Sequence, residues 1–146
     1  MKIQIKRLPN LADLPLPAYQ TDGAAAMDVR AAIEEDVTVP PGSIAAIPCG
    51  FAVGIPIGFE AQIRPRSGLA LRHGIIVANS PGTIDPDYRG EIKVLLLNHG
   101  SEPFRVTHGM RIAQMLVAPV QRVQWEEVLQ LPTSARGEAG YGHTGI

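Results

Sequence analysis

The chain has 146 residues and a formal net charge of -1, with 45% hydrophobic but only 5% aromatic residues, 13 prolines and 15 glycines. A chain of this length buries one core without a disulfide or structural metal, and its near-neutral charge argues against a nucleic-acid partner. No apolar run has the length of a secretory signal or of the roughly 20 residues that span a membrane, so we expect a soluble, cytoplasmic protein with no membrane partner.

Short segments rich in β-branched residues recur along the chain and predict strands. In chain order they are 3–6, 37–39, 44–47, 51–53, 59–64, 75–78, 91–97, 104–106, 112–118 and 120–125. The clearest is 59–64, where Phe59, Ala61 and Ile63 alternate with polar residues, as on a sheet with one buried face. Turn signals at 40–42, 54–58, 81–82, 98–101 and 108–109 separate the segments. The pattern predicts one all-β domain, a sandwich or jelly roll of short strands.

Three other segments stand apart from this pattern. Residues 67–74 predict one short helix, with Ser67 as its N-cap and Gly74 at its end. The run 94–97 is apolar throughout and predicts a strand buried on both faces, in the core or against another subunit. Residues 132–146 are rich in Gly, Ser and Thr and predict a mobile arm. The single cysteine, Cys49, lies in an apolar stretch and is interpreted as a buried structural thiol.

Three polar segments carry candidate chemistry. The acidic turn at 82–91 would project its side chains from a hairpin between two strands, although alone it reads more simply as a polar turn. Pro65, Arg66, Ser67 and Gly68 precede the helix, where backbone N–H groups and a guanidinium suit phosphate; a plain N-cap with a surface arginine explains them equally well. Residues 136–144 combine an arginine and an aromatic in a glycine-rich tail, for which disorder is the simpler interpretation when they are taken alone.

Five segments in fixed order resemble the motifs of the dUTPase family in its trimeric form. They are AMDVRA at 26–31, PRSGLA at 65–70, NSPGTIDPDYRG at 79–90, GMRIAQM at 109–115 and RGEAGYGHTG at 136–145. A single motif is weak, but the ordered set is highly specific, and the resemblance covers essentially the whole chain. It implies one domain over 1–146 with a jelly-roll-like (β-clip) sandwich, one short helix and a flexible arm, 132–146, that closes over a site.

The resemblance also implies a reaction and an assembly. The reaction is hydrolysis of dUTP to dUMP and pyrophosphate, which keeps uracil out of DNA and supplies dUMP for dTMP synthesis. The assembly is a homotrimer in which each site is built from the surfaces of two subunits and covered by the arm of the third. Asp85 would be the general base that deprotonates the attacking water, and Asp28 would hold waters of a Mg²⁺ bound chiefly by the triphosphate.

The family's substrate-binding positions carry over residue by residue. The phosphates would be bound by Arg66, Ser67, Gly68, Gln114, Arg136 and Thr144. The uracil edge would meet Asn79 and the backbone around Thr83, Ile84 and Lys93. Tyr88 would pack under the deoxyribose and exclude a 2'-hydroxyl, and Tyr141 would stack on the base as the arm closes.

The sequence departs from the family pattern in the fifth motif, and two alternatives remain. Tyr141 replaces the more usual Phe, His143 is a variant, and Ala139 replaces a usual Gly, which matters if that position needs a positive φ. One alternative is dCTP deaminase, which shares the fold, but the Arg-Ser-Ser of that enzyme does not follow Pro65. The other is a non-catalytic trimer, against which the intact Asp28, Arg66, Asp85 and Arg136 argue.

Overall fold

The computed structural model describes residues 1–141 and 143. Their secondary structure is almost entirely β, with one short α-helix and one 3-10 turn. The elements are β1 (Gln4–Arg7), η1 (Pro9–Leu11), β2 (Met27–Arg30), β3 (Val37–Val39), β4 (Ile44–Pro48), β5 (Phe51–Gly54), β6 (Phe59–Arg64), α1 (Ser67–His73), β7 (Ile75–Val77), β8 (Gly82–Ile84), β9 (Lys93–Asn98), β10 (Phe104–Val106) and β11 (Arg111–Pro119). The expected all-β class with one short helix is confirmed.

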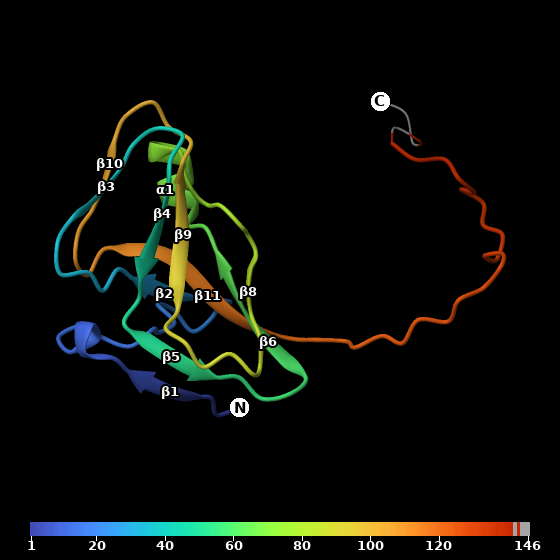
Figure 1. Ribbon diagram of the computed structural model, residues 1–146, viewed down its shortest axis with the longest axis horizontal. Coiled ribbons are helices and arrows are strands. Elements are labelled where there is room, and N and C mark those ends of the chain that lie inside the picture. Colours follow the sequence, from blue (N-terminus) through green and yellow to red (C-terminus); the bar gives the residue numbers. More distant parts are fainter. Residues whose placement is uncertain (142, 144–146) are drawn as a thin grey trace.

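Antiparallel pairing joins the strands into four small sheets. The larger two have the orders β2-β11-β6-β8 and β4-β9-β7, and the pairs β1-β5 and β10-β3 complete the body (Figure 1). The inner faces of the two larger sheets contribute to one continuous apolar core. Its members include Val29, Ala61, Ile63, Ile84, Ala113 and Met115 from the first sheet and Ile47, Ile75, Val77, Val94 and Leu96 from the second.

The alternation in β6 has the predicted effect. Ala61 and Ile63 are buried, while the polar residues between and beside them lie on the outer face, half-buried or exposed. On that outer face the pairing aligns Asp28 of β2 with Gln114 of β11, and Gln114 with Arg64 of β6. One sheet therefore supports the core with one face and presents a row of polar side chains with the other.

Helix α1 lies close to its predicted position. Its N-cap is Arg66 rather than the predicted Ser67, and no side chain in the described part of the chain caps it. Its end is as predicted: Gly74 has φ 66° and donates its N–H to Ala70 O, a left-handed termination that glycine adopts without a Cβ penalty. The first turn of α1 therefore starts directly after Arg66, a predicted substrate-binding residue.

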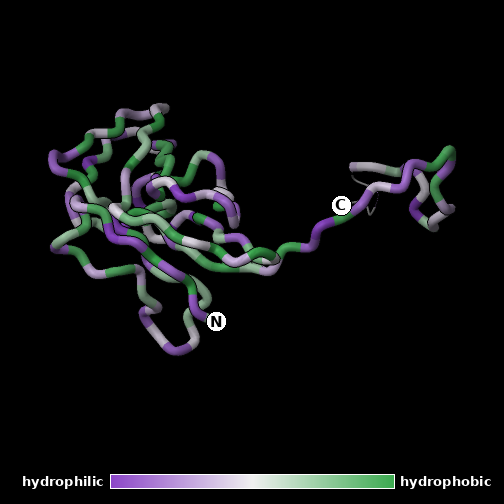
Figure 2. The backbone as a smooth tube through the Cα atoms, turned by 60° about the horizontal axis from the view of Figure 1, so that its bottom comes forward, coloured by the Kyte–Doolittle hydropathy of each residue, from purple (hydrophilic) through white to green (hydrophobic). Residues whose placement is uncertain are grey.

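The prediction of a strand at 120–125 is wrong. The body ends where Val120 donates its N–H to Gly58 O, at 2.9 Å, just after β11. From there to Tyr141 the described chain is exposed and runs away from the body as a long extension (Figure 1), which remains separate when the molecule is turned (Figure 2). A strand needs a neighbouring strand to pair its backbone groups, and none of the described strands pairs with residues 120–125.

The acidic turn is not a hairpin, contrary to the sequence-based expectation. Strand β8 before it pairs with β6, whereas β9 after it pairs with β4 and β7. The expected strand at 91–97 starts only at Lys93, and the strands β2 and β8 and the turn η1 were not predicted. Gly82, expected in a turn, instead opens β8 after a cis Ser80–Pro81 bond. Residues 85–92 thus form a connection between two sheets.

Two further expectations concern burial. Cys49 is buried, as predicted, and burial raises the pKa of its thiol far above the ordinary value. The run 94–97 is buried on one face only: Val94 and Leu96 are in the core, but Leu95 and Leu97 are half-buried. Among residues 1–141 and 143, no helix is long and apolar enough to cross a membrane.

Candidate active site

The connection 85–92 holds the predicted catalytic aspartate in a tight turn. Tyr88 donates its backbone N–H to Asp85 O at 3.2 Å, and the Arg89 guanidinium donates to Pro86 O at 2.6 Å and to Tyr88 O at 2.9 Å. Three hydrogen bonds thus tie the turn to itself. Ile84, immediately before Asp85, is buried in the core at the end of β8. An exposed carboxylate is therefore carried on a short turn with a fixed base.

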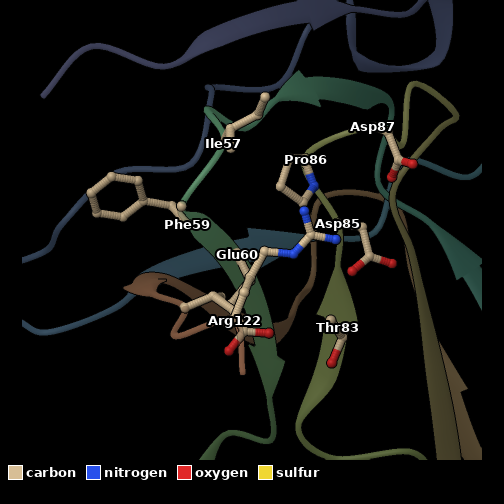
Figure 3. Close-up of a pocket in the computed structure, with 10 residues that line it drawn as sticks. Ile57, Phe59, Glu60, Thr83, Asp85, Pro86, Asp87 and Arg122 are labelled. Carbon is tan, nitrogen blue, oxygen red and sulfur yellow. The ribbon is translucent and has the colours of Figure 1, made fainter. Parts of the chain in front are cut away.

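Asp85 lines a cavity of about 560 Å³ at the edge of the four-stranded sheet. The cavity is lined by Ile57, Gly58, Phe59, Glu60, Thr83, Asp85, Pro86, Asp87, Val120 and Arg122. In Figure 3 the guanidinium of Arg122 points toward Asp85 and Pro86 from the start of the C-terminal extension. No sequence pattern points to Arg122, which lies outside all five motifs and inside the wrongly predicted strand 120–125.

The residues expected to read the base and sugar lie on β8 or in the segments just before and after it in the chain. The side-chain amide of Asn79 lies against Gly82, where a Cβ would be 3.2 Å from Nδ2. Thr83 is exposed on the strand, and Tyr88 donates its hydroxyl to Glu91 O at 2.9 Å. Lys93 is exposed at the start of β9, opposite Pro48. These residues and Asp85 form one group, the β8 cluster, defined by Asn79, Thr83, Ile84, Asp85, Tyr88 and Lys93.

The residues expected to bind phosphate and metal form a second group around Asp28. Arg66 Nε lies 3.2 Å from Asp28 Oδ1, and Arg111 Nη1 lies 3.0 Å from Oδ2. Arg66 also donates to Arg111 O at 2.8 Å, and Gln114 donates its amide to Pro65 O at 2.8 Å. Ser67 and Gly68 follow in the first turn of α1, whose leading N–H groups have no partner within the helix. We call this group, Asp28, Arg66, Ser67, Gly68, Arg111 and Gln114, the Asp28 cluster.

Arg111 is a site residue that residue-by-residue reasoning missed. It lies in the fourth motif, GMRIAQM, but no role was assigned to it. Its signal was its position at the start of a strand that pairs with β2: a bulge between Arg111 and Ala113 leaves Arg111 opposite Arg30, close to Asp28. Two guanidinium groups share one carboxylate there, an arrangement that leaves the cluster net cationic.

The two clusters do not meet within one chain. Asp28 lies on β2 and Asp85 follows β8, at opposite edges of the sheet β2-β11-β6-β8, three strand spacings or about 14 Å apart. They are also offset along the strands, because Asp28 aligns through Gln114 with Arg64, whereas Ile84 aligns with Ala61. The cavity beside Asp85 accordingly contains no member of the Asp28 cluster. In the described structure, a single chain therefore presents two separate groups of candidate site residues.

The arm residues lie apart from both clusters. Arg136 donates to Ala139 O at 2.7 Å and to Gly140 O at 3.0 Å, so its guanidinium is folded onto the arm's own backbone. Tyr141 is fully exposed, and Thr144 lies outside the described residues. In the described part of the chain every residue with positive φ is a glycine, so Ala139 does not occupy a conformation reserved for glycine.

A metal site made of protein groups alone is not present in the described chain. Among residues 1–141 and 143, no three His, Cys, Asp or Glu side chains are grouped closely enough to hold an ion. Asp28 offers a single carboxylate that arginines already contact. This donor set fits a cation held mainly by a phosphorylated ligand and water, as is typical of Mg²⁺ with nucleotides, and not a closed protein cage.

Known proteins are similar to this chain over nearly its whole length. The dUTPase family model matches residues 12–145. A deoxyuridine 5'-triphosphate nucleotidohydrolase from Rhizobium rhizogenes is 56% identical over 146 residues, covering 99% of this chain and 94% of the relative. A second, from Rickettsia massiliae, is 54% identical over 145 residues, covering 99% and 97%.

Solved structures agree on the fold. A mutant dUTPase of Staphylococcus bacteriophage 80alpha, solved with dUpNHpp, has a TM-score of 0.87 and 24% identity, with 99% of each chain covered. A mutant dUTPase from phage phi11 of S. aureus, described with a structural Mg(II) ion, has a TM-score of 0.78 and 20% identity, covering 89% of this chain and 98% of its own. The similarity confirms the jelly-roll expectation for the body.

Proposed function

The chain belongs to the dUTPase family and hydrolyses dUTP to dUMP and pyrophosphate, and we propose that Asp85 activates the water for this reaction. The observation that carries the proposal is the placement of Asp85 on a turn tied by three hydrogen bonds at the mouth of a cavity. A general base must hold its oxygen at a defined point relative to the water, and a fixed turn on a buried strand end provides that.

The proposed step conserves every atom. Asp85 accepts one proton from a water molecule while the water oxygen forms a bond to the α-phosphorus. The bond between the α-phosphorus and the oxygen bridging to the β-phosphorus breaks, and pyrophosphate leaves with that bridging oxygen. The displacement is in line, so the chain contributes mainly by positioning its groups and by stabilising the developing charge.

The Asp28 cluster is the proposed triphosphate site. A triphosphate carries several negative charges, and Arg66 with the first turn of α1 provides charged and backbone donors within one short segment. Gln114 is oriented by its bond to Pro65 O and lies next to Asp28 in the sheet. Arg136 and Thr144 would complete the binding when the arm closes, which requires the Arg136 guanidinium to leave its present local bonds.

The β8 cluster is the proposed site for the nucleoside. Asn79 and the backbone around Thr83, Ile84 and Lys93 would pair with the uracil edge, and a base with the wrong donors would leave these groups unpaired. The Tyr88 ring would lie under the deoxyribose and exclude a 2'-hydroxyl. Tyr141 would stack on the base, and its full exposure in the open arm leaves the ring free for that contact.

We propose that the cofactor is Mg²⁺, held by the triphosphate and, through water, by Asp28. When bound, the ion neutralises charge on the triphosphate and on the leaving pyrophosphate. The residues present fit such an ion, since Asp28 is one carboxylate within reach of the cluster that would receive the phosphates. Asp28 would orient the ion's waters, while the arginines hold the Asp28 carboxylate in place.

The separation of the two clusters supports a homotrimer with shared sites. Neither cluster is a complete site, since Asp85 and Asp28 lie at opposite edges of one sheet, and a second subunit would bring a β8 cluster against a neighbour's Asp28 cluster. Closed symmetric assemblies repeat such a contact at every interface. The described part of the arm, 132–141, extends away from its own body (Figure 1), and the arm would reach the site of another subunit.

Apolar surface supports the same assembly. The outer face of the sheet β4-β9-β7 carries aliphatic side chains that pair across the strands and are exposed or half-buried: Ile44, Ala46, Ile76, Leu95 and Leu97. The segment 120–131 carries a second exposed set: Val120, Val123, Trp125, Val128, Leu129 and Leu131. Apolar groups gathered in this way mark contact surfaces, and another subunit would bury them.

We place the protein in the cytoplasm, where its nucleotide substrate and Mg²⁺ occur together. The single cysteine is buried and unpaired, as suits a reducing compartment.

Hydrolysis in ¹⁸O-labelled water tests the proposed bond cleavage. Attack at the α-phosphorus places one labelled oxygen in dUMP and none in pyrophosphate, which mass spectrometry of both products measures. Label in pyrophosphate would mean attack at the β-phosphorus and would remove the assigned role of Asp85. A crystal structure with a non-hydrolysable dUTP analogue and Mg²⁺ would then test whether one subunit provides Asp85 and another provides Asp28.

A further inference from the structure

Glu91 anchors the connection that carries Asp85 and Tyr88. Its carboxylate oxygen Oε1 accepts two hydrogen bonds, from the side-chain amide of Asn10 at 3.0 Å and from the backbone N–H of Gly50 at 3.0 Å. Asn10 lies 81 positions earlier, in the 3-10 turn η1, and the same amide donates to Ala32 O at 2.9 Å. We call Glu91, Asn10 and Gly50 the Glu91 anchor.

The position of Gly50 in the anchor requires glycine. Its φ is +72°, and a Cβ there would lie 2.6 Å from the Leu11 Cβ and 2.8 Å from the Ala32 Cβ. Its carbonyl accepts the Leu8 N–H at 2.8 Å while its own N–H donates to Glu91. The backbone at Gly50 is therefore held from both sides, and it gives Glu91 a fixed donor.

Backbone bonds fix the main chain immediately after Glu91. Ile92 donates its N–H to Phe51 O at 2.9 Å and accepts the Cys49 N–H at 3.0 Å. Ile92, Cys49 and Phe51 are buried in the core. The side chain of Glu91 and the backbone of Ile92 thus attach the end of the connection to β5, just as β8 attaches its beginning to β6.

The anchored residue holds the ring of Tyr88. The Tyr88 hydroxyl donates to the backbone carbonyl of Glu91 at 2.9 Å. The ring lies directly over Gly90, where a Cβ would overlap the Tyr88 hydroxyl oxygen and would be 2.6 Å from Cζ. Gly90 therefore permits the ring's approach, and Glu91 supplies the acceptor that fixes its far end.

We infer that Glu91 is a positioning residue that sets the orientation of Tyr88 and thereby the preference for deoxyribose over ribose. The inference rests on the proposed contact between Tyr88 and the sugar. A ring excludes a single hydroxyl only if it cannot move aside by a fraction of an ångström. The hydrogen bond from the Tyr88 hydroxyl to Glu91 O resists that movement only if Glu91 is itself fixed. The hydrogen bonds from Asn10 and Gly50 fix it.

The experiment measures kcat/KM for dUTP and for UTP with the full-length protein. Replacing Glu91 with Ala removes the hydrogen bonds from Asn10 and Gly50. It is expected to lower the ratio of kcat/KM for dUTP to kcat/KM for UTP about tenfold. Glu91→Gln keeps a side-chain oxygen that can accept from Asn10 and Gly50, so it should preserve most of the ratio. Asn10→Ala removes one donor and should lie between these two, and it provides the test if Glu91→Ala fails to fold.

The matched control is His108→Ala. His108 hydrogen-bonds Ile33 O at 2.8 Å and the Asp13 carboxylate at 3.2 Å, so this variant loosens the same N-terminal segment without touching Glu91. The ratio should remain at its wild-type value in His108→Ala even where the melting temperature falls as far as in Asn10→Ala. A ratio that falls equally in both variants would mean that general loosening is the cause, which would overturn the inference.

Variants of Tyr88 separate this inference from the function on which it rests. If Tyr88→Ala leaves the ratio unchanged, the proposed sugar contact is wrong and the inference falls with it. If Tyr88→Ala lowers the ratio but Glu91→Ala and Asn10→Ala do not, the sugar contact stands and the positioning role of Glu91 is refuted. In a Tyr88→Phe background, where the hydroxyl bond is already absent, Glu91→Ala should lower the ratio less than it does in the wild type.

Discussion

Arg66 Nε lies 3.2 Å from Asp28 Oδ1, so a proposed phosphate ligand and the proposed metal-associated carboxylate hold each other before any substrate binds. Arg111 contacts the other carboxylate oxygen at 3.0 Å. The carboxylate is therefore oriented by two guanidinium groups. Asp28 would then have two tasks, to orient the waters of the proposed ion and to keep two like charges close together.

Removing the Asp28 carboxylate should weaken the response of the enzyme's activity to Mg²⁺. In Asp28→Ala we expect the Mg²⁺ concentration for half-maximal activity to rise about 10- to 100-fold, the usual cost of losing a group that orients metal-bound water. Activity titrated with Mg²⁺ at saturating dUTP measures this. The matched control is Asp36→Ala, which removes the exposed ion pair with Arg105 and should leave the Mg²⁺ response unchanged. Equal responses in the two variants would contradict the assigned role of Asp28.

Replacing Asp85 with Asn should separate catalysis from binding. The amide keeps the size of the side chain but cannot accept the water's proton, so kcat should fall roughly 10²- to 10⁴-fold while dUTP still binds. Single-turnover kinetics and isothermal titration with a non-hydrolysable analogue measure the two quantities. Asp87→Asn, two residues further in the same turn and lining the same cavity, should reduce kcat far less. Comparable losses in both variants would assign the effect to the charge of the turn as a whole.

Local sequence patterns correctly predicted the elements that depend on only a few neighbouring residues. Strands at 37–39, 59–64 and 104–106 have the predicted bounds, because alternation and turn residues act over a few neighbours. The helix ends at Gly74 as predicted, because a left-handed termination is a local property of glycine. What failed is the prediction of partners: β8 and β9 flank one turn but join different sheets, and no strand of the described residues pairs with 120–125.

The site shows the same division between local and long-range information. The resemblance to the family identified every residue of the two clusters except Arg111, but nothing in the order of the motifs along the chain indicates that Asp28 and Asp85 lie at opposite edges of one sheet. Arg111 was missed because its role depends on the bulge that turns it toward Asp28. Asn10 and Glu91 were missed because they lie 81 positions apart and meet only through the fold.

The buried thiol of Cys49 should make stability fall at high pH. Burial, with a further contribution from the charge of Glu91, raises the pKa of this thiol above its ordinary value of 9.0. Above about pH 9 the unfolded chain loses the thiol proton, whereas the folded chain keeps it. The thiol's contribution to the free energy of unfolding is therefore complete below about pH 9. Above that pH it falls by about 1.4 kcal/mol per pH unit. Urea unfolding at about pH 8 and about pH 10.5 measures the change. Cys49→Ala should show a smaller fall over the same interval, and equal falls would contradict the prediction.

Mixing two inactive variants should restore activity if the arm serves another subunit. One partner carries Asp85→Asn and an intact arm; the other keeps Asp85 but ends before Arg136. When subunits exchange randomly at equal amounts, a site that takes its Asp85 and its arm from different chains is complete in about one quarter of cases, the product of two one-half probabilities. Activity should therefore recover to about one quarter of the wild-type value, as measured by pyrophosphate release. A truncated chain that also carries Asp85→Asn is the matched control and should restore nothing. If exchange is verified by native mass spectrometry and the first mixture still recovers no activity, Asp85 and the arm act from the same chain. The long extension beyond Val120 would then have to fold back onto its own body (Figure 1).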